Sequence, residues 1–175
     1  MDLPDDLGLP KVTQPVFQHD IDNCISDNNI KHIDLLTAEQ HKIFETVVNE
    51  VGSMSTTASK SRAFFVDGPG GTGKTMLYNT LIAYFRMHHI PFASSAWTGI
   101  AATLLTEGRT VHSLFKLPVP IIETSTCNVS PTSVHAQYLR ERTVFIVDEA
   151  SMVPKHALKA IDLMLRDITG LHVLF

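Results

Sequence analysis

Apolar side chains recur at helical spacing in two early segments of the chain. A helix is predicted to begin after Thr37 and to end at Gly52. Its apolar face is made by Ile43, Phe44, Val47, Val48 and Val51. The Ser- and Thr-rich residues 53–61 are then expected to form a flexible loop. A second helix is predicted through about Met87, because Pro91 cannot continue it. Its apolar residues are Leu77, Leu81, Tyr84 and Phe85.

Short continuous apolar runs predict three buried strands of a parallel sheet. They comprise residues 63–66, 92–96 and 144–147. Strands that are covered on both faces have this continuous pattern rather than an alternating one. We expect the first and last runs to be neighbours in the sheet, because the polar motifs that follow them would then meet at one edge.

The rest of the chain is expected to alternate short helices with loops. The expected pieces are a short helix from 98 to near 108, a segment 110–115 that leads to a turn at 118–120, a polar loop 121–133 and a short helix 134–141. Pro154 suits the first turn of a final helix that Gly170 ends. Its buried face is predicted to comprise Leu158, Ile161, Leu165 and Ile168. Helices thus alternate with short strands, which predicts the α/β class with a parallel sheet flanked by helices.

Composition fits a single domain in a reducing compartment. The chain has 175 residues, of which 44% are hydrophobic, enough for one α/β core. Two cysteines, Cys24 and Cys127, do not suggest a disulfide framework or a zinc site. We see no apolar run of membrane-spanning length. The acidic N-terminal residues argue against a secretory or mitochondrial leader.

Charge divides the chain into two parts. Residues 1–36 hold seven of the eighteen acidic residues and two of the fourteen basic ones, a balance of −5; the remaining eleven and twelve give +1. We expect residues 1–35 to be an irregular lead-in segment, and residues 36–175 to form the folded part. A nucleic-acid partner would need a local basic patch on this nearly neutral part.

Residues 68–75 match the phosphate-binding pattern G-x-x-x-x-G-K-[ST] in full. The residues of this loop expected to bind a nucleotide are Gly68, Gly70, Gly71, Thr72, Gly73, Lys74 and Thr75. Glycines let the backbone wrap tightly and turn its N–H groups inward, and the following helix adds the positive end of its dipole. Lys74 can reach the β- and γ-phosphates, and the Thr75 hydroxyl can hold Mg²⁺. A glycine-rich turn without a ligand is disfavoured by the Lys-Thr pair and the strand–loop–helix context.

A second candidate motif is the acidic pair Asp148 and Glu149, at the end of the third apolar run. Asp148 would hold Mg²⁺, directly or through water, and Glu149 would act as general base on the attacking water. Alone, such a pair could simply cap a turn. Together with the glycine loop it predicts a catalytic site for nucleotide hydrolysis.

Three further residues allow two interpretations each. Gln40 follows Thr37 by three residues, so it could complete a capping box, which spacing favours, or could contact adenine through its amide. His88 and His89 could bind a metal, but are better interpreted as helix-end residues that suit the helix dipole.

The motifs together resemble one family. They are Leu36-Thr37-x-Glu39-Gln40, the loop 68–75, Thr98-Gly99-Ile100-Ala101-Ala102, His112-Ser113 and Val147-Asp148-Glu149-Ala150-Ser151-Met152. This set resembles the PIF family of DNA helicases, in the 5′-to-3′ branch of helicase superfamily 1. Residues 108–118 and 126–130 look most similar to the helicase region of Helitron rolling-circle transposons.

The resemblance implies a P-loop NTPase of RecA-like fold that couples ATP hydrolysis, with Mg²⁺, to 5′-to-3′ movement on single-stranded DNA and to duplex unwinding. Lys74, Asp148 and Glu149 would be catalytic, and Gln40 would contact adenine. The residues expected along the single-strand path are Thr98, Gly99, His112 and Ser113. Without the resemblance, they would be interpreted as a helix entry and a buried histidine. A nuclear location follows only from the expected DNA partner.

The family's next motif and its second RecA-like domain are not in the sequence, so the chain is interpreted as the N-terminal part of a helicase domain. By itself it is expected to bind ATP–Mg²⁺ but to hydrolyse it slowly. One alternative is a nucleotide-binding remnant without turnover. Another is a different P-loop enzyme, although a kinase would need an acceptor site and lid, and the Asp-Glu pair suits an ATPase better.

Overall fold

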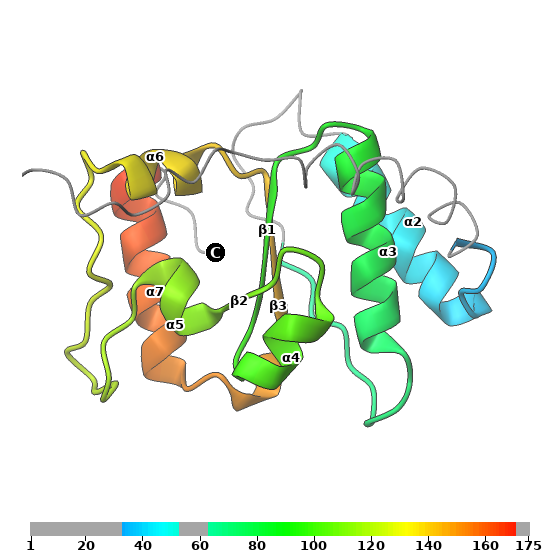
Figure 1. The fold of residues 1–175 in the computed structure, drawn as a ribbon, viewed down its shortest axis with the longest axis horizontal. Coiled ribbons are helices and arrows are strands. Elements are labelled where there is room, and N and C mark those ends of the chain that lie inside the picture. The colour runs from blue at the N-terminus through cyan, green and yellow to red at the C-terminus, as the bar shows by residue number, and fades with distance from the viewer. Residues whose placement is uncertain (1–32, 53–62, 171–175) are drawn as a thin grey trace, which may run out of the picture.

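A parallel sheet runs through the centre of the computed structural model, which describes residues 33–52 and 63–170 (Figure 1). It consists of β1 (Phe92–Ala96), β2 (Arg109–Thr110) and β3 (Val144–Asp148), in the order β2-β1-β3. β1 and β3 pair along their whole length, from Phe92 opposite Val144 to Ala96 opposite Asp148. The sheet therefore brings the ends of β1 and β3 side by side at its carboxyl edge.

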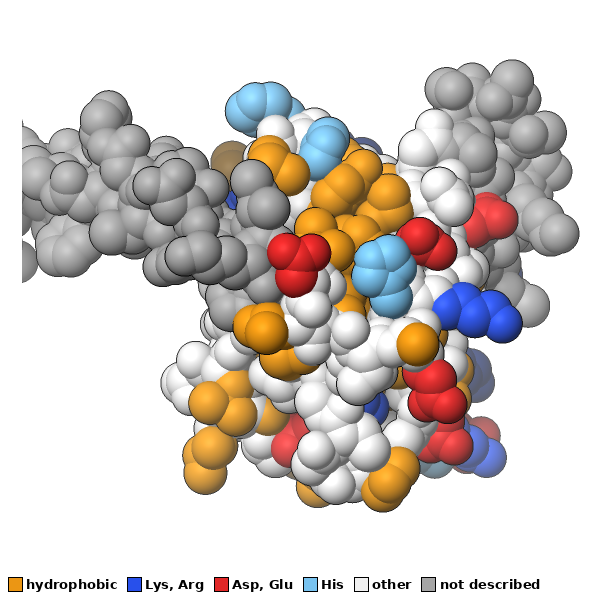
Figure 2. Space-filling view, turned by 90° about the vertical axis from the view of Figure 1, so that its right-hand side faces the viewer, with side chains coloured by type: hydrophobic (Ala, Val, Ile, Leu, Met, Phe, Trp, Pro, Cys, Tyr) orange, Lys and Arg blue, Asp and Glu red, His pale blue; other side chains and the backbone are white. Residues whose placement is uncertain are grey.

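On one face of the sheet, α3 (Lys74–Met87) packs against β1, and α2 (Ala38–Gly52) packs on the outer side of α3 (Figure 1). They meet the sheet in an apolar cluster, here called the α2/α3 cluster. It contains Phe44, Val47, Leu77, Leu81, Ile82, Phe85, Phe92, Ala96, Ala101, Ala102, Leu105 and Ile146. On the outer surface of this side, a column of hydrophobic side chains is bordered by acidic and histidine side chains (Figure 2).

The opposite face is covered by α5 (Val111–Phe115), α6 (Val134–Arg140) and α7 (Lys155–Thr169) (Figure 1). A second apolar cluster, the α5–α7 cluster, lies there. It contains Ala93, Val111, Leu114, Phe115, Leu117, Ala136, Leu139, Val153, Ala157, Ala160, Ile161, Met164, Leu165 and Ile168. Successive side chains of a strand point to opposite faces, so Phe92 joins the first cluster and Ala93 the second.

Two short elements leave the carboxyl edge of the sheet. Helix α4 (Gly99–Leu104) follows β1, and a 3₁₀ turn, η2 (Ala150–Met152), follows β3. Two residues separate β1 from α4 and one separates β3 from η2, so the first residues of both elements lie near the edge where the candidate motifs converge.

Most elements predicted from the apolar pattern are confirmed. Helices α2, α3, α6 and α7 and strands β1 and β3 lie where the pattern predicts them, and residues 121–133 form a loop. The α/β class with a parallel sheet flanked by helices is confirmed. The lead-in segment and the loop at 53–61 lie outside the described residues, apart from residues 33–35. Within the described part, no helix is long and apolar enough to span a membrane.

The predicted strand at residues 63–66 is wrong. This segment is extended but pairs with no strand in the described part of the chain, and Phe64 and Phe65 are 46% and 72% exposed. An apolar run supplies side chains, whereas a strand also needs a partner for its backbone groups. The third strand is instead the two-residue β2, which pairs with Ser95 and Ala96 and was not predicted.

One predicted core residue of α7 is also wrong. Leu158 is 51% exposed, while Ala157 and Ala160 are buried in its place. The buried stripe of α7 therefore runs through Ala157 and Ala160 rather than through Leu158. Ile161, Leu165 and Ile168 are buried as predicted.

Candidate active site

The glycine loop connects the extended segment 63–67 to the first turn of α3. Gly71 and Gly73 have φ values of 82° and 77°, which non-glycine residues rarely adopt. Gly73 caps the N-terminus of α3 without a side-chain hydrogen bond, so the first N–H groups of this fourteen-residue helix remain available to an anion. The positive-φ glycines and the start of α3 thus lie where the pattern predicts the loop, and phosphate binding by this loop stays a prediction.

The head of Lys74 lies over this loop. Its Nζ donates to the Gly68 carbonyl and to the Pro69 carbonyl, the latter at 2.9 Å. Asp67, which sequence reasoning did not identify, accepts a hydrogen bond from the Gly68 N–H at 2.8 Å and so closes the start of the loop. The ammonium group is therefore positioned over the loop by neutral carbonyls, which a phosphate can replace.

The two main motifs meet through a direct hydrogen bond. The Thr75 hydroxyl donates to Oδ2 of Asp148 at 3.0 Å, although the two residues are 73 positions apart. Asp148 is only 6% exposed, and its Oδ1 accepts from the N–H of Glu149 at 2.8 Å. A hydroxyl and a carboxylate are hard oxygen ligands, and Mg²⁺ is typically held by one or two carboxylates plus phosphate oxygens. The donor set therefore fits Mg²⁺ bound together with a nucleotide.

Tyr78, one turn after Thr75 on α3, lies close enough to Asp148 to feel its charge. Burial of Tyr78, and secondly the charge of Asp148, raises the pKa of the Tyr78 hydroxyl. The hydroxyl thus stays neutral at physiological pH and adds no second negative charge to the site.

Gln40 connects α2 to the glycine loop. Its Oε1 accepts from the Thr37 N–H at 2.9 Å, and Thr37 Oγ1 accepts from the Gln40 N–H at 3.3 Å, so the predicted capping box is confirmed. Its Nε2 also donates to the Thr72 carbonyl at 2.9 Å. The buried side chain therefore both caps a helix and holds the loop, and its contact with adenine stays a prediction.

The second acidic residue is held by a different segment. Oε2 of Glu149 accepts two hydrogen bonds from Thr98, one from the N–H at 2.9 Å and one from the hydroxyl at 2.7 Å. The same hydroxyl accepts from the Ala101 N–H at 3.2 Å and caps α4. Glu149 itself has a left-handed backbone, with φ of 55°, which is unusual for a non-glycine residue. Thr98 thus links the end of β1 to the candidate base.

The four residues predicted along the DNA path lie in two helices. Thr98 and Gly99 start α4, whereas His112 and Ser113 belong to α5. Ser113 is exposed, and its N–H donates to Thr110 Oγ1 at 3.1 Å. His112 is only partly buried, and its ring lies 4.6 Å from that of Trp97. Contact of these four with DNA stays a prediction.

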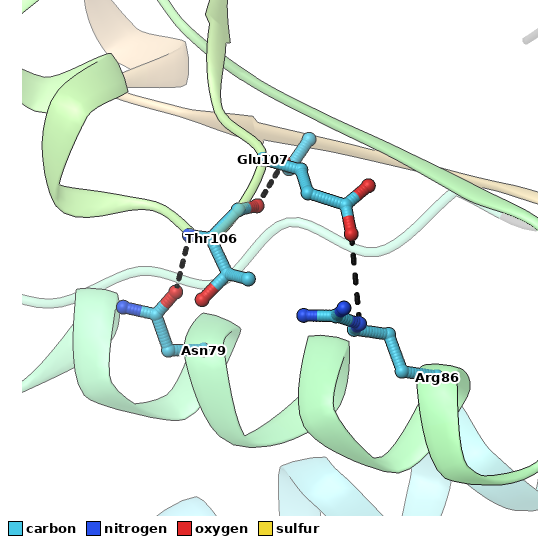
Figure 3. Close-up of polar contacts among 5 residues, drawn as sticks. Asn79, Arg86, Thr106 and Glu107 are labelled. Carbon is cyan, nitrogen blue, oxygen red and sulfur yellow. Dashed lines mark hydrogen bonds and ion pairs between the residues drawn. The ribbon is translucent and has the colours of Figure 1, made fainter. Parts of the chain in front are cut away.

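A network of polar contacts ties the loop after α4 to α3 (Figure 3). Asn79 accepts from the Thr106 N–H at 2.9 Å and donates to the Leu104 carbonyl at 2.8 Å. About two turns further along α3, Arg86 pairs with Glu107 at 3.5 Å. The helix that begins at the phosphate loop is therefore braced against the segment that follows Thr98. Sequence reasoning missed Asn79, because no local pattern reveals a partner 25 or more positions away.

Two other predicted features are structural. His88 caps the C-terminus of α3, and its Nδ1 lies 2.9 Å from the Tyr84 carbonyl, which confirms the interpretation of His88 as a helix-end residue. Burial raises the pKa of Cys127 to about 11, so its thiol is a poor nucleophile at neutral pH.

Comparison with known proteins agrees with this geometry. The family model described as PIF1-like helicase matches residues 35–173. The ATP-dependent DNA helicase Pif1 of Psychrobacter sp. (strain PRwf-1) is 36% identical over 104 residues, which cover 58% of this chain. The ATP-dependent DNA helicase PIF4 of Trypanosoma brucei brucei is 26% identical over 176 residues, which cover 93% of this chain.

Solved structures give the same likeness. The crystal structure of Bacteroides Pif1 bound to ssDNA superposes with a TM-score of 0.60 and 29% identity, over 79% of this chain and 30% of that chain. This confirms the predicted RecA-like fold. The chain spans 16% of the Psychrobacter protein and 21% of the trypanosome protein, so it corresponds to a limited part of these relatives.

Proposed function

The chain belongs to the PIF1-like helicase family, and from this premise we propose that it is the ATP-binding part of a DNA helicase. In this proposal, ATP hydrolysis drives 5′-to-3′ movement along single-stranded DNA and the unwinding of duplex DNA. Support for a DNA partner comes from the solved structure of Bacteroides Pif1, which is bound to ssDNA.

The observation that carries the proposal is the hydrogen bond between Thr75 and Asp148. It brings the first residues of a phosphate-binding helix to a buried carboxylate at the carboxyl edge of a parallel sheet. Ligands of open α/β sheets bind at this edge. The two residues would hold Mg²⁺, which would supply positive charge to offset the negative charge that develops on the phosphates.

The other residues of the site have separate roles in the proposal. Lys74 leaves the Gly68 and Pro69 carbonyls to pair with the β- and γ-phosphates, while the N–H groups at the start of α3 bind phosphate oxygens. Glu149 orients the attacking water and accepts its proton. Thr98 positions the Glu149 carboxylate through the two hydrogen bonds that it donates.

Turnover is proposed to need more than this chain. Related phosphoryl-transfer enzymes gain roughly 10³–10⁵-fold in rate from an arginine on the far side of the phosphates. We propose that a second RecA-like domain supplies this arginine. The chain alone would then bind ATP–Mg²⁺ and hydrolyse it slowly, and unwinding by the purified chain would contradict this.

The first test is ATP binding by the Lys74→Ala variant, measured by calorimetry in the presence of Mg²⁺. Because Lys74 makes charge-assisted bonds to phosphate, we expect affinity to fall by at least about tenfold. Lys159→Ala, which removes an exposed lysine on α7, is the matched control and should bind normally. Unchanged affinity in Lys74→Ala would contradict the nucleotide site.

The second test is ATP hydrolysis by the chain extended through a second RecA-like domain. Phosphate release should increase when single-stranded DNA is added, because the proposal couples ATP hydrolysis to movement along DNA. Hydrolysis that does not respond to DNA would contradict the helicase assignment while leaving the nucleotide site intact.

A further inference from the structure

The only tryptophan of the sequence, Trp97, lies between the last residue of β1, Ala96, and the N-cap residue of α4, Thr98. We propose that Trp97 and His112 form a stacking platform for a base of single-stranded nucleic acid. This inference rests on the proposed function and adds a base-binding site to it.

The two rings form a tilted aromatic pair. Their centroids are 4.6 Å apart and their planes meet at 48°. The Trp97 side chain packs against the α5–α7 cluster, which supports it on one side. Trp97 and His112 are both only partly buried, so each keeps some exposed surface. A rigidly supported aromatic ring with exposed surface is the kind of side chain on which an unpaired base stacks.

The location of the pair suits a strand that passes the catalytic edge. Trp97 directly follows Ala96, which lies opposite Asp148 in the sheet. The next residue, Thr98, is bound to Glu149 through its N–H and its hydroxyl. These bonds hold the backbone on the C-terminal side of Trp97, and β1 holds it on the other side. The backbone is therefore held on both sides of Trp97.

The chemistry favours a base over other occupants. Stacking needs only a planar partner, so it tolerates every base, as a protein that moves along a strand requires. The base of ATP is the competing occupant, and the test separates the two.

Trp97 is its own reporter, because the sequence contains no other tryptophan. The unmodified chain is titrated with oligo(dT) of about 20 nucleotides, longer than the roughly 4–16 nucleotides that single-strand-binding domains cover. We expect tryptophan fluorescence to be quenched along the same curve as the anisotropy of a fluorescein-labelled oligo(dT). A separate titration with ATP–Mg²⁺ should leave most of the fluorescence unchanged, and quenching by ATP alone would overturn the proposal.

Two substitutions separate stacking from folding. Trp97→Leu keeps an apolar side chain against the cluster but removes the ring face, and should weaken oligo(dT) binding by about tenfold, within the range of one base–aromatic stack. Trp97→Phe should keep most of the affinity. Leu163→Ala, which shortens an exposed apolar side chain on α7, is the control and should bind like the wild type. Circular dichroism confirms that each variant is folded.

The outcomes distinguish this inference from the proposed function. Oligo(dT) binding with unchanged tryptophan fluorescence, or with equal affinity in Trp97→Leu, would overturn the platform alone. Absence of any oligo(dT) binding by the wild-type chain, seen in the anisotropy measurement, would count against the proposed DNA partner and the platform together.

Discussion

The two sides of the sheet hold their functional residues in different ways. On the α2/α3 side, polar side chains bind one another across long sequence distances, as Gln40 does with Thr72 and Thr75 with Asp148. On the α5–α7 side, the Trp97 side chain packs against the apolar α5–α7 cluster, and its ring lies 4.6 Å from that of His112 on α5. One side should therefore lose function through single polar substitutions, whereas the other should lose stability first.

The strands that join the two sides limit this contrast. β1 contributes Phe92 to one cluster and Ala93 to the other, and β3 contributes Ile146 to one and packs Phe145 against the other. A change in either cluster reaches the sheet, and the sheet carries Asp148 at its edge. We therefore expect the two sides to unfold as one unit, although substitutions on the two sides affect function in different ways.

The largest expected effect is on stability. Phe115 and Phe85 are fully buried, one in each cluster. Phe115→Ala and Phe85→Ala should each lower the free energy of unfolding by about 3–5 kcal/mol, through lost burial and the cavity left behind. Urea unfolding followed by circular dichroism should show one transition for the wild type and for each variant.

These two variants test whether the two sides of the sheet fold independently. Two separate transitions in either variant would mean that the sides fold independently. If Ala variants prove too unstable to purify, Phe115→Leu and Phe85→Leu give smaller losses by the same mechanism. The folded Phe115→Leu variant should bind ATP normally, because its site of change is on the side away from the phosphate loop.

A smaller effect is expected at Thr98, where a structural and a functional role share one hydroxyl. Thr98→Val keeps the side-chain shape but removes the donor to Glu149 and the cap of α4. In the chain extended through a second RecA-like domain, we expect kcat for ATP to fall by about tenfold, a fraction of the 10²–10⁴ that a general base contributes. KM should change little, because phosphate binding is unaffected.

A matched control isolates the loss of the cap. Thr110 caps α5 by accepting from the Ser113 N–H, whereas the Glu149 carboxylate accepts its two hydrogen bonds from Thr98. Thr110→Val should cost about 1 kcal/mol of stability, like the cap component of Thr98→Val, but should leave kcat unchanged. Thr98→Ser keeps the hydroxyl, so its kcat should be close to that of the wild type. Equal kcat in Thr98→Val and Thr110→Val would show that Thr98 is only a cap.

Local patterns predicted much of the fold. Helices α2 and α3 have apolar faces at regular spacing and stop signals at their ends, and β1 and β3 are apolar runs of strand length. The errors occurred where the structure depends on strand pairing or on the rotation of a helix about its axis. Residues 63–66 have a strand-like pattern but no partner in the described part, and two residues of β2 are too few to form a pattern. Leu158 differs from the buried stripe by a small rotation about the axis of α7.

The candidate site divides along the same line. The glycine loop could be predicted because its residues are consecutive and each has a backbone or ligand role. That Asp148 would join it could be predicted from the rule that ligands bind at the carboxyl edge. The bonds from Thr98 to Glu149 and from Gln40 to Thr72 could not, since they join residues 51 and 32 positions apart and depend on the packing of whole elements.

The smallest expected effect separates the roles of Gln40. Thr37→Ala removes the hydroxyl half of the capping box and should cost about 1 kcal/mol of stability without changing ATP affinity. Gln40→Ala removes the cap contact and also the bond to Thr72, so it should additionally weaken nucleotide binding by a few-fold. Calorimetry of Gln40→Ala with ATP and with GTP then shows why nucleotide binding is weakened. We expect equal losses for both nucleotides, because the amide already bonds to Thr37 and Thr72 and acts by holding the loop. A loss of affinity for ATP alone would show that the remaining donor and acceptor sites of the amide recognise adenine. Unchanged affinity for both nucleotides would show that Gln40 acts only as a helix cap.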